Sequence, residues 1–336
     1  VSTIFAAATG IVGASVTILG IMAGKTMIRT GYDTRLSAGL ICAGGTLGIL
    51  IPPSIMLVVM GPVLEIPVTD LFAAAIMPGI LLACLYAAYT TLRCYLNPKL
   101  GPVLPANEQP TNMAKVWYEF IMGLIPPAGL VFFALGSILF GLATPTEGAG
   151  MGAFGAILLA LAYKKLTLPG LKDALLKTLE ITALIMFLVA ASNFFGAVFS
   201  KLGTPSLLTD FLLNLEVNRY VILAIIMAAI FLLGWPLEWV PIVLIVLPIV
   251  LPLVIELGFN LTWFAILVAV NLQTAWLSPP VALSAYFLKG VVPEWDLKDI
   301  YLGMMQFMVI QVIGLVLIII FPKIALWLPG VMYPSP

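Results

Sequence analysis

Histidine is absent from this chain of 336 residues, and charged side chains account for only 9% of it. The chain therefore lacks the residue that most often relays protons near neutral pH and ligates transition metals. Cysteine is scarce: Cys42, Cys84 and Cys94 lie in or beside apolar segments without metal-ligand spacing, so we predict neither a disulfide nor a zinc site. Walker loops, nucleophile elbows and His-Glu metal motifs are missing too, which argues against an enzyme.

Hydrophobic residues, by contrast, make up 62% of the chain. This composition lies outside the range of soluble globular, disordered and nucleic-acid-binding proteins. The fifteen basic and fifteen acidic residues cancel, so the net charge points to no nucleic-acid partner. We therefore predict an all-α polytopic membrane protein surrounded by a lipid bilayer.

One apolar segment, residues 31–60, is long enough to span a bilayer but is interrupted at its centre by helix-breaking residues. These are Gly44, Gly45, Gly48, Pro52 and Pro53. Unpaired backbone groups are costly in hydrocarbon, so an unwound stretch at that depth survives only where it packs in protein or lines a cavity. The segment predicts a broken transmembrane helix. The alternative is an ordinary span that the proline pair kinks or ends.

A second segment, residues 258–287, repeats this pattern at an offset of 227 residues. Gly31 pairs with Gly258, and the proline pair has its counterpart in Pro279 and Pro280. Asp70 and Asp299, each near the start of the following span, correspond at an offset of 229 residues. Interrupted helices at matching places in two halves point to the binding site of a transporter.

The two patterns divide the chain into three regions. Residues 1–96 are the remainder of a first repeat, which we expect to continue upstream of Val1; residues 97–116 are a polar linker; and residues 117–333 are a second repeat. The elements expected within them are the return limb of a re-entrant hairpin within Val1–Ile28, a broken helix at 36–60, a span at 71–92, a second hairpin at about 219–256 and a broken helix at 261–288. Val1–Ile28 is alternatively a helix interface rich in small residues.

The distribution of basic residues predicts the topology. If the loop at residues 25–35 is cytoplasmic, every basic residue except Lys201, Arg219 and Lys323 falls on the cytoplasmic side, as the positive-inside rule requires. An odd number of crossings then separates the two hairpins. The two repeats are therefore expected to be inverted, which suits a site near mid-membrane that opens to either side.

The interruptions offer oxygen ligands. A hard cation such as Na⁺ prefers several oxygens, and unwound carbonyls with Ser, Thr or Asn side chains supply them without a buried charge. The first half provides Thr9, Ser15, Gly44, Gly45, Thr46 and Ser54, and the second provides Asn271, Gln273, Thr274 and Ser278. For each hydroxyl the alternative is a bond back to a carbonyl of its own helix. Glu238 either lies at the interface or faces a cavity, and proton coupling is less favoured because the glutamates are scattered.

Three motifs resemble the large membrane subunit of tripartite ATP-independent periplasmic (TRAP) transporters. They are AGGTLGILIPPS at Ala43–Ser54, ATPTEGAG at Ala143–Gly150, and the stretch from Pro248 through Gly258 to SPPV at Ser278–Val281. The similarity covers essentially the whole chain. It implies the ion-transporter superfamily fold, an elevator-type mechanism driven by sodium, a small four-helix membrane subunit, a periplasmic substrate-binding protein, and a bacterial or archaeal inner membrane.

The resemblance also implies where ligands bind. One sodium site would comprise Thr9, Ser15, Gly44, Gly45, Thr46 and Ser54, and the other Glu238, Asn271, Thr274, Ser278 and Pro279. The substrate cavity between them would be lined by Gly13, Thr17, Pro52, Pro53, Gln273 and Pro280. Trp276 departs from the small, glycine-containing stretch usual there, and we expect it to narrow the cavity. Thr144–Glu147 lies between two spans, where a structural role is expected.

The leading hypothesis is the membrane subunit of a sodium-coupled importer of a small organic acid, such as a C4-dicarboxylate, keto acid or sugar acid. A single-component carrier or exporter of the same superfamily is one alternative. An assembly subunit without transport activity is another.

Overall fold

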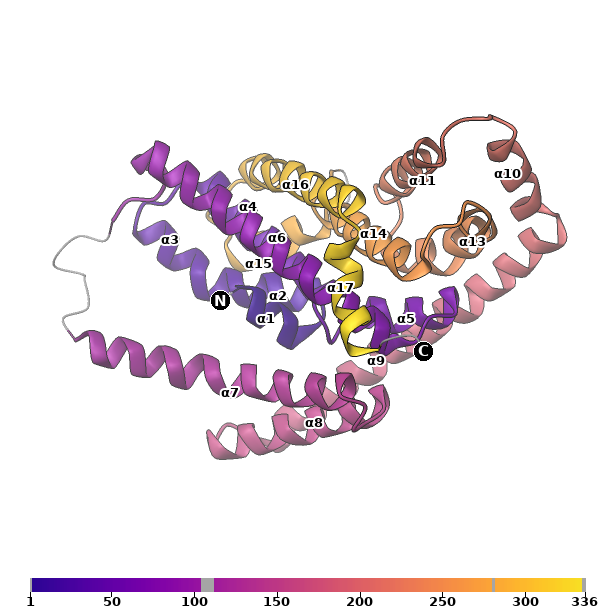
Figure 1. The fold of residues 1–336 in the computed structure, drawn as a ribbon. Helices are drawn as coiled ribbons and strands as arrows, with labels where there is room; N and C mark the ends of the chain where they lie inside the picture. The colour runs from indigo at the N-terminus through magenta and orange to yellow at the C-terminus, as the bar shows by residue number, and fades with distance from the viewer. Residues whose placement is uncertain (1, 104–111, 280–281, 334–336) are drawn as a thin grey trace.

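The computed structural model describes residues 2–103, 112–279 and 282–333, and every regular element in them is helical (Figure 1). Six segments of the described chain are long and apolar enough to cross a membrane: α6 (Val68–Leu96), α7 (Met113–Leu139), α8 (Pro145–Ala162), α9 (Leu168–Lys201), Trp239–Glu256 and α16 (Leu297–Ile320). The prediction of an all-α polytopic membrane protein is thereby confirmed.

The chain begins with a helical hairpin, here called the first hairpin (residues 2–29). Helix α1 (Ser2–Thr9) ends at Gly10, whose φ of +63° turns the chain in a conformation that glycine adopts without steric cost. The return limb comprises α2 (Val12–Leu19), a π-helical turn at Gly20–Gly24 and α3 (Lys25–Arg29). The predicted hairpin is therefore present, with its turn at Gly10 and Ile11.

The next helix is broken, as predicted for residues 36–60. Asp33 caps α4 (Thr34–Thr46) by accepting a 2.8 Å hydrogen bond from the Leu36 amide. A short 3-10 helix at Leu47–Ile49 follows. The chain is then non-helical until Ser54, which caps α5 (Ile55–Leu64).

The second half contains the corresponding elements. The second hairpin comprises α11 (Arg219–Leu233), a turn at residues 234–238, α12 (Trp239–Pro241), a π-helical turn at Ile242–Val246 and α13 (Leu247–Glu256). The second broken helix comprises α14 (Leu261–Gln273), a 3-10 helix at Thr274–Trp276 and α15 (Leu283–Val291). Asn260 caps α14 as Asp33 caps α4, through a 3.0 Å bond from the Trp263 amide.

The two broken helices agree closely at the offset of 227 residues. Helix α14 and its 3-10 helix start and end exactly 227 residues after α4 and its own 3-10 helix. Gly31 and Gly258, paired by the same offset, both have positive φ, at 75° and 68°. The glycine, the capping residue and the interruption therefore stand at the same spacing in both segments.

Each half packs against the other. Helix α4 lies along α16, the long last span of the second half, and α14 packs on α6, the last span of the first half. In the same way α5 packs on α13, and α15 packs on α2. The contacts of α4 with α16 and of α14 with α6 therefore join elements at matching places in the two halves.

The helices of the structure differ in places from the elements expected from the sequence. Helix α7 begins at Met113, inside the predicted linker, because Asn112 caps it through the Lys115 amide. A further helix, α17 (Lys323–Met332), follows the last predicted span and packs on α6. Helix α10 (Thr204–Leu213) precedes the second hairpin and packs on α13.

Thr144 and Glu147 cap the start of a helix. The Glu147 carboxylate accepts hydrogen bonds of 2.8 Å from both the amide and the hydroxyl of Thr144, and the Thr144 hydroxyl accepts one from the Glu147 amide. This reciprocal arrangement is a capping box that starts α8.

Candidate functional site

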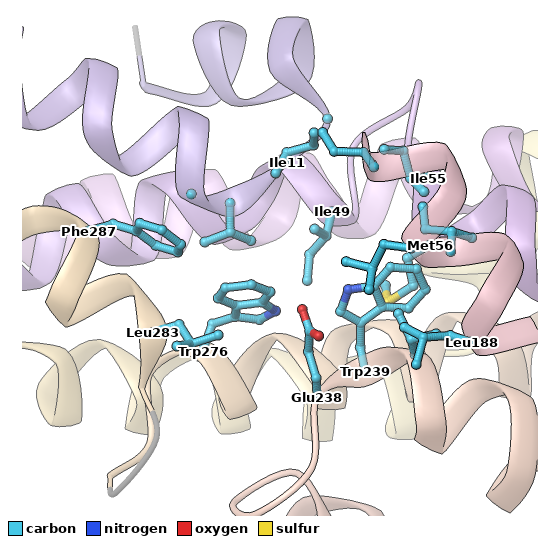
Figure 2. A pocket seen from close by; sticks show the side chains of 17 residues that line it. Ile11, Ile49, Ile55, Met56, Leu188, Glu238, Trp239, Trp276, Leu283 and Phe287 are labelled. Carbon is cyan, nitrogen blue, oxygen red and sulfur yellow. The ribbon is translucent and has the colours of Figure 1, made fainter. Parts of the chain in front are cut away.

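A cavity of about 250 Å³ lies where both hairpin turns and both interruptions meet (Figure 2). We call it the central cavity. The first half contributes residues 10–13 of the hairpin turn and Ile49, Ile55 and Met56 beside the interruption; the second half contributes residues 238–240 and Trp276, Leu283 and Phe287. Helix α9 closes one side with four aliphatic side chains, Ile181, Leu184, Ile185 and Leu188.

Glu238 is the one ionisable residue among those that line the central cavity. Its carboxylate points into the cavity between the indole rings of Trp276 and Trp239 (Figure 2). Glu238 therefore faces a cavity, which is one of the two positions that the sequence left open. Trp276 lines the cavity as well, and its bulk occupies space that a smaller residue would leave open.

The predicted first sodium-site residues lie where the first hairpin rests on the first broken helix. The hydroxyls of Thr9 and Ser15 are hydrogen-bonded to each other, and Ser15 also donates to the Ile11 carbonyl at 2.9 Å. A Cβ at Gly48 would lie 2.6 Å from the Ala6 carbonyl oxygen and 3.1 Å from the Ser15 hydroxyl. Several oxygens of the hairpin turn therefore surround the interruption.

Glycine allows this close approach. A Cβ at Gly45 would lie 2.4 Å from a methyl carbon of Val16, and one at Gly44 would lie 2.9 Å from the Cβ of Ser2. A Cβ at Gly10 would lie 3.0 Å from the Pro53 carbonyl oxygen. Any larger residue would separate the hairpin from the broken helix.

The other two hydroxyls of this set bond to their own helix. Thr46 donates to the Ala43 carbonyl at 2.8 Å, and Ser54 donates to the Ile49 carbonyl while capping α5. Both hydroxyl protons are therefore bonded to nearby carbonyls of the same segment, which is the alternative stated above for such hydroxyls. The oxygen lone pairs are not used up by these bonds, so a role as cation ligands stays a prediction.

The predicted second site resembles the first in its local bonds. The amide nitrogen of Asn271 donates to the Met227 carbonyl of α11 at 2.7 Å, which ties the second broken helix to the second hairpin. Thr274 donates to the Asn271 carbonyl at 2.6 Å, and Ser278 donates to the Thr274 carbonyl at 2.8 Å. Glu238 lines the central cavity, whereas Asn271, Thr274 and Ser278 do not.

The predicted substrate-cavity residues are dispersed. Gly13 lines the central cavity, whereas Thr17, Pro52 and Gln273 do not. Pro53 lines a different, apolar cavity against α7 and α8. Gln273 is buried and accepts a 3.1 Å hydrogen bond from Gln311 of α16. Pro279 lies in the second interruption, outside the central cavity, and Pro280 lies outside the described residues.

Sequence reasoning missed most of the residues that line the central cavity. Trp239 follows Glu238 directly and could have been noticed as an aromatic residue beside an intramembrane carboxylate. Met56, one turn after the first interruption, had only its proximity to the break as a signal. The aliphatic side chains of α9 had no sequence signal, because only packing brings that helix to the cavity.

These features define a class: a multi-pass α-helical membrane protein in which two interrupted helices and two hairpin turns enclose one cavity. Residues 1–324 match the family described as "Tripartite ATP-independent periplasmic transporter, DctM component". The chain therefore belongs to this family and is a TRAP transporter large permease, a membrane transport subunit. The family consists of secondary transporters and not of enzymes.

The curated relatives differ in the substrates that their names state. The C4-dicarboxylate large permease DctM of Pseudomonas aeruginosa is 30% identical over 330 residues, which cover 97% of this chain and 75% of the relative. The sialic acid large permease SiaM of Vibrio cholerae is 28% identical over 331 residues, covering 98% and 75%. The 2,3-diketo-L-gulonate large permease YiaN of Escherichia coli is 27% identical over 300 residues, covering 89% of this chain and 68% of the relative.

Membership of a tripartite family implies a small membrane partner and a periplasmic binding partner in general.

Proposed function

We propose that this protein is the membrane subunit of a sodium-coupled importer in the bacterial inner membrane. It takes up a small organic acid that a periplasmic substrate-binding protein delivers, and it works together with a small four-helix membrane subunit. The observation that carries the proposal is the central cavity, where two hairpin turns and two interrupted helices from opposite halves of the chain meet.

Inverted repeats are part of this proposal. Support comes from the matching bounds of the two broken helices and from the exchanged contacts, in which α4 packs on α16 while α14 packs on α6. Two units related by a pseudo-two-fold axis in the membrane plane make such reciprocal contacts. The same axis allows one cavity to open to either face in turn.

An elevator motion fits the division of the molecule into a packed core and an outer layer. The hairpins and broken helices form the core, whereas α7 and α8 pack mainly on each other and expose most of their apolar surface (Figure 1). A core that carries the cavity can slide against such an outer layer without unfolding either part.

Sodium coupling rests on the oxygen atoms at the two interruptions. The Ala6 carbonyl and the Ser15 hydroxyl of the first hairpin approach Gly48, and Asn271, Thr274 and Ser278 are linked by hydrogen bonds at the second interruption. The described residues contain no group of three or more His, Cys, Asp or Glu side chains that could hold a metal ion. Neutral oxygens suit a monovalent cation that must bind and leave repeatedly.

The test is uptake into proteoliposomes that contain this subunit with its small membrane partner, supplied with the binding protein and its ligand. Replacing external Na⁺ by K⁺ should abolish accumulation, because K⁺ does not fit sites built for the smaller ion. Omitting the binding protein should also abolish it. Full uptake in K⁺ would refute sodium coupling, and full uptake without the binding protein would favour a single-component carrier.

A further inference from the structure

The central cavity has a charge pattern that an organic anion alone does not match. Among the described residues that line it there is no Lys or Arg, and the Glu238 carboxylate is the one ionisable group. Within the part of the chain that the structure describes, Glu238 forms no ion pair. The Glu238 side chain is exposed to the cavity and faces no protein cation there, so Coulomb attraction favours a ligand that brings a positive charge over one that adds a second negative charge.

Aromatic rings flank this carboxylate. Trp239 and Trp276 are 7% and 8% exposed, which makes their rings fixed walls, and both also line a small recess next to Glu238. Phe287 lies on the same side of the cavity as Trp276 (Figure 2). Indole faces attract cations, most of all weakly hydrated organic ammonium groups, and several rings beside a carboxylate are typical of ammonium recognition.

The opposite side of the cavity offers amide groups. Ile11, Val12 and Gly13 line it at the start of α2, and no side chain caps this helix end. Figure 2 shows Ile11 and Glu238 approaching the cavity from opposite sides. The uncapped start of α2 and the positive end of its helix dipole suit a carboxylate there, as a complement to the ammonium site at Glu238.

We propose that the substrate of this protein is a zwitterion, an organic acid that also carries an ammonium group, and that Glu238, Trp239 and Trp276 bind this ammonium group. The inference rests on the proposed transport function and names the substrate class of the same cavity. It assigns Glu238 to the substrate instead of to a sodium ion.

The experiment measures binding to the complex of this subunit with its small membrane partner in lipid nanodiscs, through intrinsic tryptophan fluorescence and thermal stability. The probes are glycine betaine, proline and γ-aminobutyrate, which carry quaternary, secondary and primary ammonium groups. The controls are tert-butylacetate, the uncharged-head isostere of glycine betaine, and the dianion succinate. At least one zwitterion should give a saturable change and thermal stabilisation, and neither control should.

Substitutions locate the site. Glu238→Gln should abolish zwitterion binding, Glu238→Asp should keep part of it, and Trp276→Leu or Trp239→Leu should each weaken it about tenfold. The matched controls are Trp235→Leu, in the same hairpin turn but outside the central cavity, and Glu256→Gln at the end of α13. Both should bind the zwitterion as the unaltered protein does.

Three outcomes would overturn the inference: no saturable response to any of the three zwitterions, an equal response to tert-butylacetate or succinate, or unchanged binding in Glu238→Gln. If Glu238→Gln instead shifts only the sodium dependence of uptake, Glu238 is a sodium ligand and the inference is wrong while the proposed function stands. Zwitterion binding without sodium-driven uptake would refute the proposed coupling alone.

Discussion

Gly303 and Gly39 decide how closely α16 approaches α4. A Cβ on Gly303 would lie 2.0 Å from the Arg35 carbonyl oxygen, and one on Gly39 would lie 2.5 Å from the Gly303 carbonyl oxygen. Both obstacles are backbone atoms, which a side-chain rotation cannot remove. The Arg35–Asp299 ion pair at 2.8 Å lies near this crossing but is largely exposed, so it adds little stability.

Gly303→Ala should therefore destabilise the protein, by about 1–3 kcal/mol through forced separation of the two helices. Alanine gains about 1 kcal/mol in helix propensity over glycine, which is too little to offset the clash. Gly196→Ala in α9 is the control, because a Cβ there meets nothing within 4 Å. Thermal unfolding in detergent should show a lower midpoint for the first variant and an equal or higher one for the second; equal midpoints would contradict the contact.

Each broken helix is interrupted near a proline pair, but the proline pair alone does not explain the interruption. Pro126 and Pro127 lie inside α7, which continues from Met113 to Leu139. Around Pro52 and Pro53, by contrast, the first hairpin packs directly on the interruption through Gly10 and Gly48. Packing by a second element therefore decides whether a proline pair ends a helix at that depth.

This difference predicts the effect of removing each pair. Joint replacement of Pro52 and Pro53 by Ala should leave assembly intact but reduce sodium-driven uptake at least about tenfold, because without the fixed φ of proline the interruption no longer holds its carbonyls in place against the first hairpin. The same change at Pro126 and Pro127 should leave most uptake. Proteoliposome uptake and gel filtration of both variants provide the comparison. A non-transporting assembly subunit would be insensitive to either change.

Most of the helices and their interruptions were predictable from local sequence signals. Both broken helices, the capping residues Asp33 and Asn260, and the hairpin turn near Gly234 follow from residues a few positions apart. The structure starts α7 at Met113, inside the region that the sequence predicts as linker, because Asn112 is a good capping residue. Helix α17 was missed because its ten residues are too few to span a bilayer.

At the scale of the whole molecule, the outer helices present wide apolar surfaces. Side chains such as Phe132 and Phe187 are exposed on α7 and α9, which suits contact with lipid or with the small membrane partner. The six apolar segments and the distribution of basic residues together predict which loops face the cytoplasm.

Two loops on either side of α9 test this orientation. In a protein whose Cys84 and Cys94 are replaced by Ser, Lys165→Cys should react with a membrane-impermeant maleimide only from the cytoplasmic side. Glu216→Cys should react only from the outside, because one crossing, α9, separates the two positions. Cys42 is buried and serves as an internal negative control. Labelling of both positions from the same side would contradict the topology.

The sequence by itself determined the membrane environment, the two interruptions and the glycine and capping residues that begin each broken helix, because these depend on hydropathy and on bonds between near neighbours. Only the tertiary structure decided which side chains meet in the central cavity. Ile11, Leu188, Glu238 and Trp276 are far apart in sequence, and their distances depend on how four elements pack. Spacing along the chain does not contain that information, which is why Thr17 and Gln273 were predicted to line the cavity while Trp239 was missed.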